Sequence, residues 1–342
     1  MSDWPVVGVA GARGVVGGAF LSILADAGLP AAALRAFGSA EGSAGYGDGS
    51  VPTRPLDEAA ATELDVLFLA TDGTTSRQIV EGPGRAVPLI VDNSSAFRLD
   101  PQVPLVVPEA NGHAIGRREG NLIANPNCTT AAAVVALAPI RDLAGLESVD
   151  LASYQAVSGA GRAALDAYET ERAAGGTAQA EGSPFHGRIA DNVVPQIDVL
   201  DDDGWSGEER KIIAELRKIL ELPDLDISAT AVRVPVHTGH SVALHVRTSR
   251  NVPVKEVMEA LAAAPGLEYR HATGSNRHPM PLDVVGRDPV LVGRLRSIPG
   301  RQRGLALFLS SDNLRKGAAL NAIQIAACAE PDRFGRLAPP SR

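Results

Sequence analysis

Short apolar runs alternate with helix-like patterns through the first third of the chain. Stretches with apolar residues at three- and four-residue spacing, notably residues 14–27 and 74–80, separate several of these runs. Strands that are apolar throughout and are joined by helices are typical of a parallel sheet covered on both faces. The predicted strands are Val6–Ala10, Leu34–Gly38, Val66–Ala70, Leu89–Asp92, Leu105–Val107 and Leu122–Ala124.

The pattern changes at residue 128. A predicted helix of about 14 residues is followed by a strand, Val149–Ala156. A charged helix near residues 208–220 is followed by longer strands in which polar and apolar positions alternate, as in an antiparallel or mixed sheet with one exposed face. These longer strands are Ser228–Val236, Ser241–Thr248, Val290–Ser297 and Leu305–Ser310. We therefore expect an α/β domain at 1–127 and a second, α+β domain at 128–312. A helix at 313–330 should dock back on the first domain, and residues 331–342 should be disordered.

Composition narrows the functional classes. The chain has 342 residues, 45% of them hydrophobic, and a formal charge of −8 without a basic cluster, which argues against a nucleic-acid partner. No apolar run approaches the ~18 residues of a membrane span, and the N-terminus shows no cleavable signal. The two cysteines, Cys128 and Cys328, suit a reducing cytoplasm, and no cysteine–histidine spacing predicts a metal site. Cys328 falls in a helical pattern, where we expect it to be packed.

A glycine-rich turn follows the first strand and opens a helix: Gly11-Ala12-Arg13-Gly14-Val15-Val16-Gly17. Glycines in this context let the backbone approach a pyrophosphate at a helix N-terminus, although the spacing G-x-x-G-x-x-G is weak evidence alone. The first domain is thus predicted to be Rossmann-like and to bind a dinucleotide. At the ribose end, Ser39 and Glu41 follow the second strand, and Arg13 could instead meet a 2′-phosphate. Plain solvent exposure explains Arg13 and Glu41 equally well.

The stretch Asn125-Pro126-Asn127-Cys128-Thr129-Thr130 is the strongest chemical signal. Asn127 can cap a helix, which puts the sulfur of Cys128 in the first turn, where the helix dipole favours an anion. Such a thiol has a lowered pKa and acts as a nucleophile. The alternative is a small buried hydrophobic residue, which most free cysteines are.

Other candidates have ordinary structural explanations when each is considered singly. Arg98 lies in a polar loop after a strand, and Glu208 and Lys211 share a helix face, as solvated ion pairs do. Arg233 and His240 are seven residues apart, so they face one pocket only if Gly239 bends the chain. His237 is then a rival base.

Ordered motifs over residues 5–330 resemble the aspartate-β-semialdehyde dehydrogenase family. Besides Gly11–Gly17 and Asn125–Thr130, they are Asp92–Arg98, Val107–Asn111, Tyr154–Gly161, Asn192–Asp198, Arg233–Pro235, Gly239–Ser241 and Asp312–Gly317. The resemblance implies reversible NADP-dependent reduction of β-aspartyl phosphate to aspartate semialdehyde with release of phosphate, by a homodimer or homotetramer.

The resemblance also implies a role for individual residues. Cys128 is the nucleophile, His240 the general acid/base, and Gln155 orients the intermediate. The residues implied to bind substrate are Glu208 and Arg233, which hold the amino acid, Arg98 and Lys211, which hold phosphate, and Asn127. Cofactor contacts fall to Gly11, Ala12, Arg13, Gly14, Val15, Val16, Ser39, Glu41, Ser158, Gly159 and Asn313.

The chain departs from the family pattern after the second strand. The family's Ser-Arg-Ser-Ala-Gly-Lys, whose cations meet the NADP 2′-phosphate, is replaced by Glu41–Tyr46, and Arg13 stands where threonine is common. Either Arg13 takes over the 2′-phosphate or the enzyme uses NAD. Asp191 replaces an aromatic residue, which leaves the packing of its loop open. Two other functions remain: a non-catalytic nucleotide-binding paralogue, or a reductase of another acyl phosphate or acyl-CoA, which the pairing of Glu208 with Arg233 disfavours.

Overall fold

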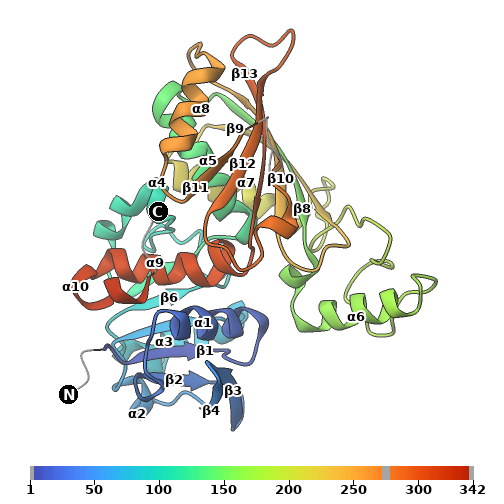
Figure 1. Ribbon diagram of the computed structural model, residues 1–342. Coiled ribbons are helices and arrows are strands. Elements are labelled where there is room, and N and C mark those ends of the chain that lie inside the picture. Colours follow the sequence, from blue (N-terminus) through green and yellow to red (C-terminus); the bar gives the residue numbers. More distant parts are fainter. Residues whose placement is uncertain (1–3, 272–277, 339–342) are drawn as a thin grey trace. The chain divides into compact units, whose positions relative to one another are not determined.

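A computed structural model describes residues 4–271 and 278–338 (Figure 1). The chain divides into two compact units, residues 4–127 with 318–338, and Cys128–Gly317.

The first unit is built on a seven-stranded sheet in the order β3-β4-β2-β1-β5-β6-β7, in which only β3 is antiparallel to its neighbour. The strands are β1 (Val7–Ala10), β2 (Leu34–Phe37), β3 (Gly42–Tyr46), β4 (Gly49–Arg54), β5 (Val66–Leu69), β6 (Ile90–Asp92) and β7 (Leu122–Ala124). The helices are α1 (Val15–Asp26), α2 (Glu58–Ala61), α3 (Gly73–Glu81), α4 (Pro108–Asn111), α9 (Leu320–Ala329) and α10 (Pro331–Phe334).

Apolar side chains cover both faces of this sheet, as predicted. In β5, Val66 and Phe68 enter one core with α1 and α9, whereas Leu67 and Leu69 enter another with α2. Residues of α9 thus pack on the first unit although they follow the second unit in sequence. The strands bring their carboxyl ends to one edge of the sheet, which is where parallel α/β sheets bind ligands.

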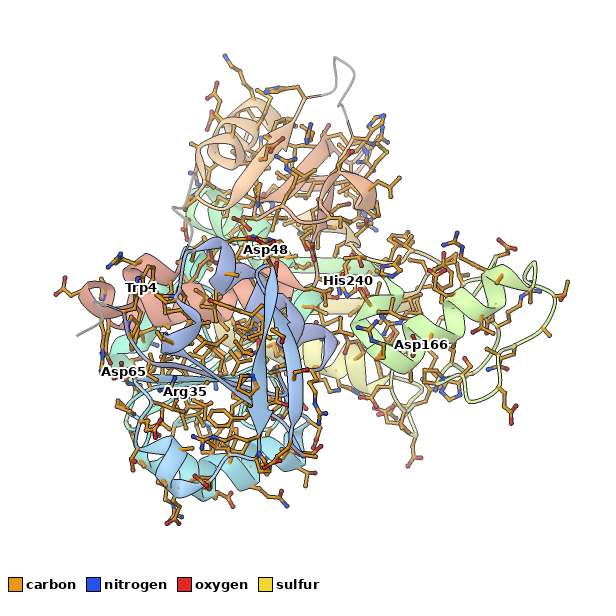
Figure 2. All side chains as sticks on the ribbon, turned by 60° about the horizontal axis from the view of Figure 1, so that its bottom comes forward. Trp4, Arg35, Asp48, Asp65, Asp166 and His240 are labelled. Carbon is orange, nitrogen blue, oxygen red and sulfur yellow. The ribbon has the colours of Figure 1, made fainter. Side chains whose placement is uncertain are left out.

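The second unit is built on a mixed six-stranded sheet in the order β11-β12-β13-β10-β8-β9. The strands are β8 (Ser148–Gln155), β9 (Asp226–Arg233), β10 (His240–Arg247), β11 (Leu267–Arg270), β12 (Val290–Ser297) and β13 (Gly304–Ser311). The helices are α5 (Cys128–Ala144), α6 (Arg162–Ala173), α7 (Gly207–Leu220) and α8 (Val254–Ala263). Helices α5, α7 and α8 pack together and against the strands, whereas α6, which carries Asp166, lies apart from them (Figures 1 and 2). The predicted fold class, a Rossmann-like parallel sheet plus an α+β domain with a mixed sheet, is confirmed.

Several sequence predictions need correction. Residues 105–107 form an isolated bridge, Leu105 to Ala124, instead of a strand. The segment after β2, where the sequence analysis placed no strand, is the hairpin β3–β4, whose tip carries Asp48 (Figure 2); its glycines and short alternation hid the strands. Helix α8 and strand β11 were also missed.

Residues 331–338, predicted to be disordered, differ from expectation as well, and residues 339–342 of that prediction lie outside the described residues. Phe334 and Leu337 are fully buried in the first unit, so the segment from 331 to 338 is ordered by its two apolar anchors. Cys328 is exposed. It lies two positions beyond Ala326, about 200° around the helix, and therefore points away from the core.

The loop after α6 is held by one buried carboxylate. Glu171, which is 1% exposed, accepts hydrogen bonds from the backbone N–H groups of Ala180 (3.1 Å), Ile189 (2.7 Å) and Ala190 (2.9 Å). This clamp anchors the loop that contains Asp191, without the aromatic residue that the family pattern led us to expect.

Candidate active site

Cys128 is the first residue of α5, directly after the turn that contains Pro126. The predicted helix start is confirmed. The first turn contains no acidic side chain, so the N–H groups at the start of the helix act on the sulfur without a competing negative charge in that turn. Cys128 is half-buried there, and thiols at helix N-termini in general ionise more readily than free thiols.

His240 lies beside this sulfur, with Nε2 3.2 Å from Sγ. It is the first residue of β10 and is labelled in Figure 2. Gly239 precedes it with a φ of +99°, and a Cβ there would come within 2.9 Å of the Pro281 carbonyl oxygen. Only glycine fits such a bend. The predicted bend at Gly239 is present, and it brings His240 to the same site as Arg233.

A short network fixes the segment before His240. The Asn313 side chain accepts from the Gly239 N–H (2.9 Å) through Oδ1 and donates to Ser158 Oγ (3.0 Å) through Nδ2. The Ser158 N–H in turn bonds the His237 carbonyl oxygen (3.0 Å). The His237 ring bonds its neighbour Thr238 (2.8 Å), so the imidazole at the sulfur is that of His240.

Three buried side chains from three elements surround the cysteine and histidine. Gln155, at the end of β8, donates from Nε2 to Oε1 of Glu208 in α7 at 2.9 Å. Arg233, at the end of β9, donates from Nη1 to the Ala156 carbonyl oxygen at 2.7 Å. Burial lowers the pKa of Arg233, while attraction to Cys128 and to Glu208 opposes that shift. The site therefore combines a nucleophile, an imidazole, a cation and a carboxylate.

Two glycines bring backbone close to these side chains. A Cβ on Gly159 would lie 3.0 Å from Arg233 Nη1 and 3.1 Å from His240 Nε2, and one on Gly317 would lie 2.9 Å from Cys128 Cβ. Gly317 belongs to a π-helical turn, Arg315–Ala319, a local distortion that is frequent at functional sites. Sequence reasoning placed Gly317 in a motif but assigned it no role, because its proximity to Cys128 depends on residues far apart in sequence.

Lys211 and Arg98, the residues implied to bind phosphate, contact other groups of the protein. Lys211 Nζ pairs with Asp198 Oδ2 at 2.6 Å, and this hydrogen bond lowers the pKa of Asp198. The expected ordinary explanation, an ion pair between Lys211 and Glu208, is therefore not what the structure has. Arg98 lies in the first unit, buried, and donates to the carbonyl oxygens of Asn125 (2.9 Å) and Asn93 (2.7 Å). Asn127 is also buried and ends that unit.

The glycine loop borders a cavity of about 610 Å³ in the first unit. Gly11 has a φ of +77°, and a Cβ there would lie 2.3 Å from the Ala70 carbonyl oxygen. No side chain caps the start of α1 at Gly14, so its first N–H groups can bind an anion. Predicted contacts Gly11, Arg13, Gly14 and Ser39 line the cavity; Ala12, Val15, Val16 and Glu41 are not among its lining residues.

Arg13 lies across the end of β2. A Cβ on Gly38 would be 3.4 Å from its Nε, and one on Gly42 would be 3.0 Å from its Nη1. The guanidinium is exposed and makes no hydrogen bond or ion pair within residues 4–271 and 278–338. Glu41 is exposed as well. The missing side chains of Gly38 and Gly42 thus leave room for an arginine contributed by the glycine loop.

The described residues contain no group of three or more histidine, cysteine, aspartate and glutamate side chains that could hold a metal ion. No helix among those residues is long and apolar enough to cross a membrane.

Comparison with known proteins agrees with this arrangement. Residues 6–118 match the family model "Semialdehyde dehydrogenase, NAD binding domain", and residues 137–316 match "Semialdehyde dehydrogenase, dimerisation domain". The aspartate-semialdehyde dehydrogenase of Streptomyces akiyoshiensis is 42% identical over 94% of this chain and 97% of its own length. That of Aquifex aeolicus is 38% identical over 94% and 96%.

A solved structure shows the same architecture. Aspartate semialdehyde dehydrogenase II from Vibrio cholerae, complexed with ASA, superposes with a TM-score of 0.90 at 36% identity, covering 97% of this chain and all of that one. The chain therefore belongs to the aspartate-semialdehyde dehydrogenase family.

Proposed function

We propose that the chain is an aspartate-semialdehyde dehydrogenase, which interconverts β-aspartyl phosphate and aspartate β-semialdehyde through a thioester at Cys128, with NADP as hydride carrier. The observation that carries this proposal is the contact of 3.2 Å between Cys128 Sγ and His240 Nε2, beside buried Arg233 and Glu208. A free amino-acid substrate is zwitterionic, and a buried cation near a buried carboxylate is complementary to it.

The cysteine performs covalent catalysis in this proposal. Its sulfur attacks the carbonyl carbon of the acyl phosphate, a C–S bond forms, and the C–O bond breaks with its electron pair leaving on phosphate. The carbonyl oxygen becomes negative during the attack, next to the imidazole of His240. Gln155, held by Glu208, orients the intermediate. When bound, the reduced nicotinamide supplies the hydride that turns the thioester into the aldehyde.

The remaining substrate groups are assigned by charge. Arg233 binds the α-carboxylate and Glu208 the α-amino group, while Arg98 and Lys211 bind phosphate and Asn127 completes the substrate contacts. The mixed sheet of the second unit leaves Tyr154 exposed, and its ring lies 6.1 Å from that of Phe308. Aromatic residues on an open sheet face suit a homodimer or homotetramer.

The cofactor contacts in this proposal are the glycine loop, Ser39, Ser158, Gly159 and Asn313. Neither cysteine forms a disulfide, which suits the cytoplasm. The expected pathway is biosynthesis of the amino acids lysine, threonine and methionine and of diaminopimelate.

The test is reduction of NADP by aspartate semialdehyde with and without inorganic phosphate. We expect turnover only when phosphate is present, because phosphate must cleave the thioester to release the acyl group. Sulfate serves as the matched anion control. Equal turnover with coenzyme A, or none with any semialdehyde, would refute the proposal.

Replacing Arg233 by alanine should raise the KM for aspartate semialdehyde by about 10- to 100-fold, because a charge-assisted hydrogen bond to the substrate is lost. The variant should also lose its preference for aspartate semialdehyde over 3-aminopropanal, which lacks the carboxylate. Arg172→Ala, which removes an exposed arginine of α6, is the control. A preference that survives in Arg233→Ala would assign the carboxylate to another residue.

Replacing Arg13 by alanine should erase the preference for NADP over NAD, and Glu41→Ala should increase it, because a guanidinium attracts a 2′-phosphate that a carboxylate repels. We expect the wild-type preference to be smaller than is usual in the family. Calorimetric binding of 2′,5′-ADP should weaken about 10- to 100-fold in Arg13→Ala. Arg35→Ala, whose arginine is paired with Glu63, is the control. If the wild type prefers NAD and Arg13→Ala changes nothing, Glu41 binds the ribose hydroxyl.

A further inference from the structure

The imidazole of His240 accepts a hydrogen bond from the protein backbone. The Ala156 N–H donates to Nδ1 at 3.0 Å. A peptide N–H can only donate, so Nδ1 presents its lone pair and carries no proton. A neutral imidazole then has its proton on Nε2, which is the atom that faces Cys128 Sγ at 3.2 Å. The Nε2–H group is therefore a donor to sulfur.

The backbone around Ala156 cannot easily turn to accept a proton instead. The peptide that carries this N–H also uses its oxygen, that of Gln155, to accept from the Val234 N–H at 3.0 Å. The next peptide is fixed at both ends, because its oxygen accepts from Arg233 Nη1 (2.7 Å) and its Val157 N–H donates to the Val236 oxygen (2.8 Å). Sheet pairing thus sets the tautomer of the histidine.

Burial and the neighbouring Arg233 cation favour the same neutral state of His240. Burial lowers the pKa of His240 well below its usual value, and the Arg233 cation on β9 lowers it further. Cys128 on α5 and Glu208 on α7 are the other ionisable groups of the site. Beside His240 on β13 lies Ser311, and the Asp312 carboxylate that follows accepts backbone N–H groups of Gly286 and Leu314. An imidazolium would place an N–H against the Ala156 N–H and next to Arg233.

We propose that His240 works as a neutral hydrogen-bond donor, first to the Cys128 thiolate and then to the oxyanion formed when that thiolate adds to a carbonyl, and not as the base that removes the thiol proton. The identity of the carbonyl rests on the proposed function. The thiol proton is lost to solvent, and Arg233 and the start of α5 stabilise the thiolate. As the C–S bond forms, the C=O π pair moves onto oxygen and the proton stays on Nε2. The oxygen keeps its charge, so the double bond re-forms without a base.

Nuclear magnetic resonance of the wild-type protein labelled with ¹⁵N in its seven histidines tests this state directly. We expect His240 to give one protonated Nε2 and one unprotonated Nδ1 from about pH 5.5 to pH 8.5, where an ordinary histidine titrates. His240→Gln identifies its signals, and His237→Gln is the matched control. An imidazolium at neutral pH, or a proton on Nδ1, would overturn the proposal.

A second measurement needs no spectral assignment. In a Cys328→Ser background, the rate of Cys128 alkylation by iodoacetamide should follow a single ionisation. His240→Gln should move its pH midpoint by about one unit or less, the effect of one hydrogen bond. If His240 were an imidazolium partner, its loss would raise the midpoint by about four units. Both measurements are made without substrate, so they remain decisive if the enzyme acts on another acyl group.

Discussion

Replacing Cys128 by serine should lower turnover by about 10⁴-fold or more, the scale seen when an enzyme loses its nucleophile. The serine hydroxyl is far harder to ionise than a thiol at the start of a helix, so the covalent intermediate does not form. Binding of 2′,5′-ADP should be unchanged, because the glycine loop lies in the other unit. A single-turnover assay and calorimetry on the same preparation separate the two effects.

Alkylation gives an independent check on this cysteine. Cys328 is exposed and Cys128 is only partly so, so accessibility alone predicts faster labelling of Cys328. We expect iodoacetamide to modify Cys128 well before Cys328 at neutral pH, because the thiolate is the reactive form. Cys328→Ser should retain full activity. Equal labelling of the two thiols, or an active Cys128→Ser enzyme, would remove Cys128 from its assigned role.

The sequence predicted the elements whose burial pattern is strong and local. Strand β5 is apolar at every position and packs against a core on each face, so its pattern could be recognised directly. The hairpin β3–β4 alternates over only a few positions, with Ala44, Val51 and Thr53 as its buried residues. Several of its other positions are glycine or proline, which resemble a loop. Tertiary pairing with β2 makes it a pair of strands, and no local signal reports that.

The candidate site likewise has features that the local sequence predicts and features that only the folded chain shows. The nucleophile could be identified because its helix start is encoded in neighbouring residues. The bend at Gly239 could be deduced because Arg233 and His240 had to face one pocket. The contact of the Ala156 N–H with His240 Nδ1 joins residues 84 apart in sequence and involves a backbone group of an unremarkable alanine. Likewise, the position of the Arg13 side chain over Gly38 and Gly42 requires the folded end of β2.

Replacing His240 by asparagine should lower kcat by about 10²-fold or more and change KM little. The reason is geometric. The variant loses the imidazole whose Nε2 lies 3.2 Å from Cys128 Sγ, whereas Arg233 and Glu208, the proposed ligands of the amino acid, remain. Steady-state kinetics with aspartate semialdehyde and phosphate measure both parameters.

His237→Asn is the matched control for this second variant. Both substitutions remove an imidazole from the same segment, but the His237 ring is engaged with Thr238. We expect the His237 variant to stay within about threefold of wild type in kcat, as a residue outside the chemistry should. The opposite ranking would move the catalytic imidazole to His237. Equal and large losses in both variants would indicate that the bend at Gly239, and not the Nε2–H group of His240, is what the reaction requires.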